Sequence, residues 1–156
     1  MWLSNSKFDI AEQEAECVRG EQIIVFGLGA EEYAIDSLDV MEIDRMKEIR
    51  INVVPKVPNY VEGIINLRGD VVPVVNLKKR FGIVSPETGR KQRIIVVRSN
   101  NSLVGLLVDS VFGVKSTEGL EILPPTDEMA AEAGYISAIV LEEERMFFVI
   151  NVDAIA

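Results

Sequence analysis

The sequence contains no histidine and a single cysteine, Cys17, among its 156 residues. The absence of histidine excludes Ser-His-Asp and Cys-His catalysis, imidazole metal ligation and histidine phosphorylation within this chain. One cysteine cannot form an internal disulfide, a redox pair or a zinc ribbon. Any catalytic chemistry would therefore depend on carboxylates, lysine, tyrosine or backbone groups.

Long apolar runs are also missing. The longest apolar stretches, at 71–75 and 94–97, are far shorter than the roughly 20 residues that a membrane helix needs. Residues 1–7 lack a basic start followed by an apolar segment, which is the pattern of a secretory signal. Together with the free cysteine, these features predict a cytoplasmic protein that reaches a membrane only through protein partners and does not insert.

Basic residues are outnumbered, 16 against 25 acidic ones, which argues against nucleic-acid binding. The charge is unevenly distributed. Residues 1–44 hold eleven acidic and two basic side chains, residues 66–98 two acidic and eight basic, and residues 118–156 nine acidic and one basic. This separation suits docking to charged protein surfaces, although ordinary decoration of turns explains it equally well.

Short β-branched runs separated by turn residues recur from residue 22 onward. The pattern predicts an all-β protein of barrels or sandwiches. Pro73 places its strand at an edge or a bulge, and helical patterning is confined to 58–62 and 127–133. The expected strands are 22–28, 33–35, 40–43, 51–54, 71–77, 93–97, 103–108, 111–114, 135–141 and 146–150.

The chain divides into an acidic N-terminal tail, residues 1–20, and one domain, residues 21–156. Strands this short fit two small barrels better than one large barrel. The turn-forming residues 85–89 predict the break between the two barrel subdomains.

Carboxylates lie close together in the sequence, as at Glu31 and Glu32 and in the run 142–144. One possible function is therefore a carboxylate-based enzyme, which would need two opposed acids in a cleft. Another is a barrel that binds a small ligand in an enclosed apolar pocket.

A polar cluster interrupts the apolar residues of segment 60–77. Asn66 and Arg68 stand there between Gly63 and Gly69. Glycine permits positive φ or the close approach of another backbone, and an arginine in apolar surroundings needs a carboxylate partner. The segment is either a turn locked by an internal ion pair or a turn that faces a partner.

Segments 62–69 and 72–77, EGIINLRG and VPVVNL, closely resemble the signature of the CheW family, the bacterial chemotaxis coupling proteins. The resemblance covers residues 21–153, and the same fold occurs in the CheA histidine kinase and in CheV proteins. Further matching segments, in the expected order, are 32–36, 40–43, 55–58, 105–109 and 148–152.

This resemblance implies two five-stranded, SH3-like β-barrels packed together, with no catalytic activity, cofactor or metal. It implies an adaptor that bridges the regulatory domain of CheA to the cytoplasmic tip of chemoreceptors, the methyl-accepting chemotaxis proteins. Receptors would control the kinase through this bridge.

The resemblance also implies roles for individual residues. It places an ion pair of structural importance between Glu42 and Arg68. The implied kinase-binding residues are Ile24, Ser37 and Val40, and the implied receptor-binding residues are Gly63, Asn66, Arg68, Gly105, Val111 and Val114. Ordinary strand packing is an equally simple explanation for the three valines.

Overall fold

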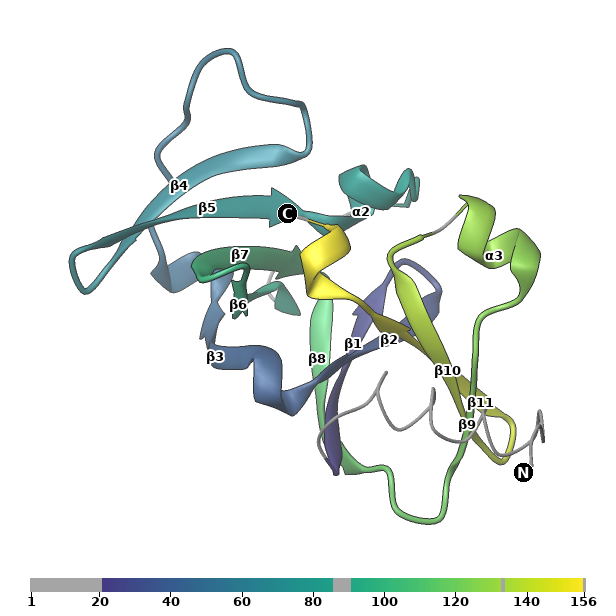
Figure 1. Cartoon of the computed structure of the whole chain (residues 1–156). Coiled ribbons are helices and arrows are strands. Elements are labelled where there is room, and N and C mark those ends of the chain that lie inside the picture. The colour runs from purple at the N-terminus through teal and green to yellow at the C-terminus, as the bar shows by residue number, and fades with distance from the viewer. Residues whose placement is uncertain (1–20, 86–90, 133, 156) are drawn as a thin grey trace.

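The computed structural model describes residues 21–85, 91–132 and 134–155, which form two β-sheets with short helices between strands (Figure 1). The all-β prediction is confirmed. One sheet has six strands in the order β8-β1-β2-β11-β10-β9, and the other has five in the order β3-β6-β7-β5-β4. The first sheet exceeds the expected five strands because the short β9 pairs with β10.

The bounds of the elements follow. The six-stranded sheet contains β1 (Gln22–Leu28), β2 (Glu31–Asp36), β8 (Ser110–Ser116), β9 (Glu121–Leu123), β10 (Ile136–Glu142) and β11 (Arg145–Ile150). The five-stranded sheet contains β3 (Val40–Arg45), β4 (Val61–Leu67), β5 (Asp70–Asn76), β6 (Arg93–Ser99) and β7 (Ser102–Val108). The helices are η1 (Ser37–Asp39), η2 (Met46–Glu48), α2 (Leu77–Phe81), α3 (Asp127–Glu132) and η4 (Val152–Ala154). None of the helices in the described ranges is long and apolar enough to cross a membrane.

The chain crosses between the sheets twice. It leaves the six-stranded sheet through η1 and returns to it at Asp109, between β7 and β8. The predicted break at 85–89, of which only Ser85 is described, lies between β5 and β6, and both of these belong to the five-stranded sheet. That segment therefore does not separate the two sheets. The tail 1–20 lies outside the described residues.

Strand β1 is buried on both faces, which explains its continuous apolar sequence. Successive side chains of a strand point to opposite faces. Ile23 and Val25 pack with Phe147 inside the curl of the six-stranded sheet. Ile24 and Phe26 face the other way, into a core that is shared with the five-stranded sheet.

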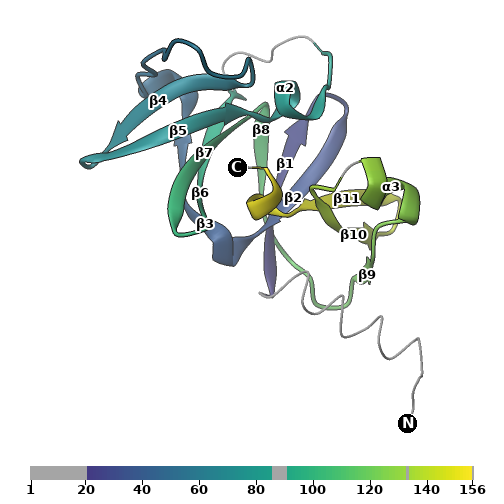
Figure 2. The same ribbon diagram turned by 45° about the horizontal axis from the view of Figure 1, so that its top comes forward.

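Three apolar cores result from this arrangement. Each sheet curls around a small core of its own, and the shared core lies between the sheets. Strand β6 is likewise buried on both faces, because Ile94 faces the inner core of its sheet and Ile95 faces the shared core. The C-terminal η4 lies between the sheets in Figures 1 and 2 and adds Val152 to the shared core.

Local predictions fail at Pro58 and at one apolar run. Segment 51–54 forms no strand; it contributes one isolated bridge, Asn52 to Ile64. Pro58 precedes a turn, and not a helix, because β4 already begins at Val61. Pro73 lies in β5, which is an interior strand in sheet order, but β5 pairs with β7 only from Val74 onward. At Pro73 the strand therefore has β4 as its only paired neighbour, and this local edge position tolerates a residue without an N–H group.

Candidate functional site

The polar cluster forms the two-residue turn between β4 and β5. Arg68 has φ 50° and Gly69 has φ 91°, the pair of positive values that a type I′ hairpin requires. The Asn66 side chain accepts a hydrogen bond from the Gly69 amide at 3.0 Å. The tight turn thereby holds the Arg68 side chain outward at the tip of the hairpin.

Arg68 donates a hydrogen bond to Glu42 on β3. Strands β3 and β4 are the opposite edges of the five-stranded sheet, so this contact joins the two edges of a curled sheet. Hydrogen bonds with Asp44 and with Arg68 lower the pKa of Glu42. Burial, reinforced by the hydrogen bond and charge of Glu42, raises the pKa of Asp44 to about 6.

Two of the expected receptor-binding residues, Gly63 and Gly105, are buried and serve packing. A Cβ on Gly63 would lie 2.2 Å from the Asn52 carbonyl oxygen, and a Cβ on Gly105 would lie 2.9 Å from the Ile94 side chain. Backbone or core atoms thus occupy the space beside both glycines, and neither offers a surface to a partner.

The expected kinase-binding residues separate into core and surface. Ile24 is 6% exposed and belongs to the shared core, so its side chain does not lie on the surface where the resemblance would place it. The reason is the burial of β1 on both faces. Ser37 and Val40 are half-buried where η1 meets β3.

Exposed apolar side chains beside Ser37 were not anticipated from the sequence. Leu38 is 63% exposed, and Met41 and Ile43 project from the outer face of β3. Alternation in segment 40–43 shows that Met41 and Ile43 share one face of the strand, but it does not reveal which face meets solvent. We call Ser37, Leu38, Val40, Met41 and Ile43 the η1–β3 surface.

The remaining expected receptor-binding residues lie on β8, an edge strand of the six-stranded sheet. Val111 is half-buried against the shared core, whereas Val114 is 61% exposed. We call these two residues the β8 surface. The β4–β5 turn projects from the other sheet, and Figure 1 shows it at the far left, away from the central β8.

The chain is similar to known proteins over nearly its whole length. A family model described as a CheW-like domain matches residues 22–156. The chain belongs to the CheW family. CheW of Helicobacter pylori is 30% identical to it, and the match covers 98% of this chain and 97% of that protein.

Two further similarities support the fold and the family. The scaffolding protein TtCheW from Thermoanaerobacter tengcongensis matches with a TM-score of 0.75 and 35% identity, over 84% of this chain and 88% of that crystallised chain. CheA of Borreliella burgdorferi is 31% identical over 83% of this chain, but the match covers only 15% of CheA. A CheW-like domain is thus one part of that larger protein.

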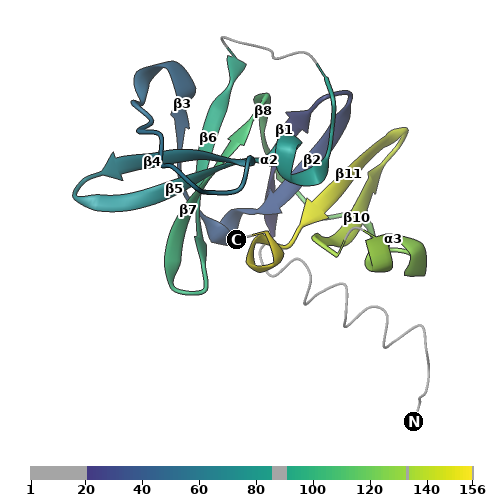
Figure 3. The ribbon, with the colours of Figure 1, turned by 90° about the horizontal axis from the view of Figure 1, so that it is seen from above.

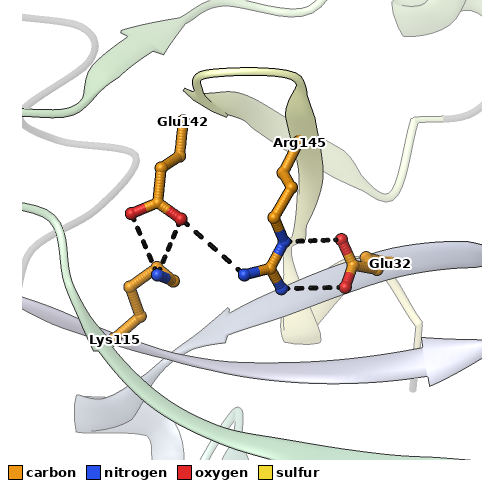
Figure 4. A network of polar contacts seen from close by, with 4 residues as sticks. All are labelled: Glu32, Lys115, Glu142 and Arg145. Carbon is orange, nitrogen blue, oxygen red and sulfur yellow. Dashed lines mark hydrogen bonds and ion pairs between the residues drawn. The ribbon is translucent and has the colours of Figure 1, made fainter.

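Membership of the CheW family identifies a non-catalytic chemotaxis adaptor that links receptors and CheA, rather than an enzyme. The carboxylates also take structural roles. Glu32 accepts hydrogen bonds from Arg145, and Glu142 accepts them from Lys115 (Figure 4). No group of three or more acidic or cysteine side chains in the described ranges is arranged to hold a metal ion. The interior of each curled sheet is filled by a cluster of that sheet's own apolar side chains, and this packing disfavours a ligand-binding barrel.

Proposed function

We propose that this CheW-family chain binds the CheA regulatory domain through the η1–β3 surface and a chemoreceptor tip through the β8 surface and the β4–β5 turn. One observation carries the proposal. Exposed apolar side chains occur on both sheets, at Met41 and Ile43 of β3 and at Val114 of β8. A bridging adaptor needs two separate surfaces so that both partners bind together.

The composition of each surface suits its partner. Leu38, Met41 and Ile43 provide apolar contact area, and desolvated apolar anchors dominate the affinity of protein interfaces. The receptor tip that the resemblance implies is a helical hairpin, and the apolar edge of β8 suits the face of an amphipathic helix. The polar β4–β5 turn would provide a second, separate contact. Arg68 would then provide a directed hydrogen bond at the rim. The chain would act in the cytoplasm, recruited to membrane receptors by these contacts.

A titration with two purified partners tests the proposal. Leu38→Asp places a charge in the η1–β3 surface, and we expect affinity for the CheA regulatory domain to fall at least about tenfold. Val40→Asp should act in the same direction, but Val40 also packs against the shared core. The exposed Leu38 therefore provides the cleaner test.

Receptor binding is tested separately. Arg68→Ala should weaken binding of the receptor tip about three- to tenfold while leaving CheA binding intact. Val84→Asp is the matched control, since Val84 is 99% exposed and lies in neither surface. Normal affinity of the folded Leu38 and Arg68 variants for both partners, or an equal loss in the control, would reject the assignments.

A further inference from the structure

A pocket of about 510 Å³ opens at one end of the six-stranded sheet, among the β1–β2 turn, the β7–β8 corner and the β10–β11 turn. Figure 3 shows the β1–β2 and β10–β11 turns at the same end of the molecule. We call this hollow the mouth pocket. Its principal lining residues are Gly27, Glu31, Phe112, Glu144, Arg145 and Met146.

A network of four charged side chains lies at this end of the sheet (Figure 4). Arg145 donates hydrogen bonds to both carboxylate oxygens of Glu32, at 2.9 and 3.3 Å. Lys115 donates to both oxygens of Glu142, at 2.7 and 2.9 Å. The Arg145 guanidinium also lies 4.8 Å from the ring centre of the buried Phe147. Both cations of the network are thus already engaged by carboxylates of the sheet.

An apolar ledge forms one side of the mouth pocket. A Cβ on Gly27 would lie 3.0 Å from the Ser110 hydroxyl and 3.2 Å from the Phe112 ring. Because Gly27 has no side chain, the Phe112 ring lies close against the β1 backbone. Phe112 is nevertheless 59% exposed to solvent. Met146 is 46% exposed and also lines the pocket. Phe112 and Met146 therefore expose apolar surface to solvent inside the mouth pocket.

Negative charge surrounds this ledge. Glu31 and Glu144 line the pocket and are exposed, and neither forms an ion pair within the described part of the chain. Arg145, the one cation in the lining, binds Glu32. The pocket consequently presents free carboxylates beside an aromatic face, a combination that favours a cation with an alkyl stem.

We propose that the mouth pocket docks an arginine or lysine side chain carried by an apolar-flanked segment of a protein partner. The alkyl stem packs on Phe112 and Met146, and the cationic group lies between Glu31 and Glu144. This contact goes beyond the proposed function, because the pocket shares no residue with the η1–β3 surface, the β8 surface or the β4–β5 turn. It gives the adaptor a further point of attachment.

A capped pentapeptide, Gly-Leu-Arg-Leu-Gly, is the probe, and the full chain labelled with ¹⁵N reports its binding at low salt. We expect saturable shifts of the Glu31, Ser110 and Met146 amide signals. The same peptide with glutamine in place of arginine should bind at least about fivefold more weakly, because it lacks the charge that lies between Glu31 and Glu144. Added salt should weaken the arginine peptide, since exposed charges are screened.

Two matched double variants complete the test. Glu31→Gln with Glu144→Gln should weaken the arginine peptide at least about threefold. Glu118→Gln with Glu121→Gln removes two exposed charges outside the pocket and should have little effect. The proposal is overturned if the arginine peptide causes no saturable shifts, if the glutamine peptide binds equally well, or if both double variants act alike.

Discussion

Gly63 and Gly69 belong to the same hairpin, and both have positive φ, yet the space around them differs. A Cβ on Gly63, at φ 151°, would collide with the backbone of Asn52 at 2.2 Å. A Cβ on Gly69, at φ 91°, would meet no atom within 4 Å. The missing side chain at Gly63 therefore lets the Asn52 backbone lie close to β4. At Gly69 glycine is needed only for the positive φ of the turn.

Alanine substitutions separate these two roles. Gly63→Ala should lower the free energy of unfolding by about 3 kcal/mol, through steric overlap added to backbone strain. Gly69→Ala should cost about 1 kcal/mol, from strain alone. Urea denaturation of both variants measures the difference, and equal losses would show that the contact with Asn52 is unimportant.

Asp44 makes the stability of the fold depend on pH. Its pKa is raised to about 6 from an ordinary 3.8, so between these values the folded chain holds a proton that the unfolded chain releases. The stability contributed by this group is therefore present at low pH and falls as pH rises through that window. Glu42, whose pKa is lowered, contributes in the opposite sense and loses its stabilising effect as pH falls.

Asp44→Asn isolates the first contribution. The variant should melt at a higher temperature than the parent chain at about pH 7, because the charged Asp44 faces Glu42, and the gap should close near pH 4. Asp70→Asn, an exposed carboxylate of the same sheet, is the control. Thermal melts at both pH values provide the measurement, and a gap that does not change with pH would contradict the expectation.

At the scale of elements, ion pairs link strands that are not neighbours in their sheets. Arg68 and Glu42 join the two ends of the five-stranded sheet. Lys115 on β8 and Glu142 on β10 are separated by three strands in sheet order, yet their charged atoms lie 2.7 Å apart. Both sheets must curl for these contacts to form, which gives each sheet an inner face and a core of its own.

A double-mutant cycle measures the contribution of the second pair. Lys115→Met and Glu142→Gln should show a coupling energy of about 1 kcal/mol, since both side chains are about three-quarters buried. The Arg45–Glu48 pair, at 3.7 Å and mostly exposed, is the comparison and should couple by less than about 0.5 kcal/mol. Denaturant unfolding of all variants gives both values. If the Lys115–Glu142 coupling energy is no larger than that of the exposed Arg45–Glu48 pair, the ion pair does not help to hold the six-stranded sheet in its curled shape.

At the scale of the whole molecule, a buried ion pair joins the two sheets. The Lys78 ammonium on α2, which follows the five-stranded sheet, lies 3.0 Å from Asp109, and both side chains are less than 10% exposed. The other oxygen of Asp109 accepts a hydrogen bond from the Gly29 amide at 2.8 Å, in the β1–β2 turn of the six-stranded sheet. One carboxylate thereby links parts of both sheets.

Lys78→Met should lower the free energy of unfolding by about 3–5 kcal/mol, because it removes the Lys78 charge from beside a buried carboxylate. Adding Asp109→Asn should recover part of this loss, since the amide oxygen keeps an acceptor for Gly29 without a charge to desolvate. Urea unfolding of the single and double variants checks the order. A double variant less stable than the single one would show that the charge on Asp109 matters for another reason.

Much of the fold could be predicted from local sequence. Most strands follow from β-branched runs bounded by turn residues, and helix 127–132 agrees with its patterning. The hairpin turn at Arg68 and Gly69 follows from the same local rules. The predictions at Pro58 and segment 51–54 were wrong, because their outcome depends on which strands lie beside them.

The sequence by itself determined the all-β class, most strand positions and the CheW-family signature, since these depend on alternation, turn chemistry and residue order. The tertiary structure alone decided that Ile24 is core while Met41 is surface, because alternation defines two faces without saying which one is covered. It also decided the mouth pocket, because Gly27 and Met146 line one hollow only when β1 and β11 lie in the same sheet. Contacts between residues so far apart in sequence depend on the packing of the whole molecule, and no local pattern encodes them.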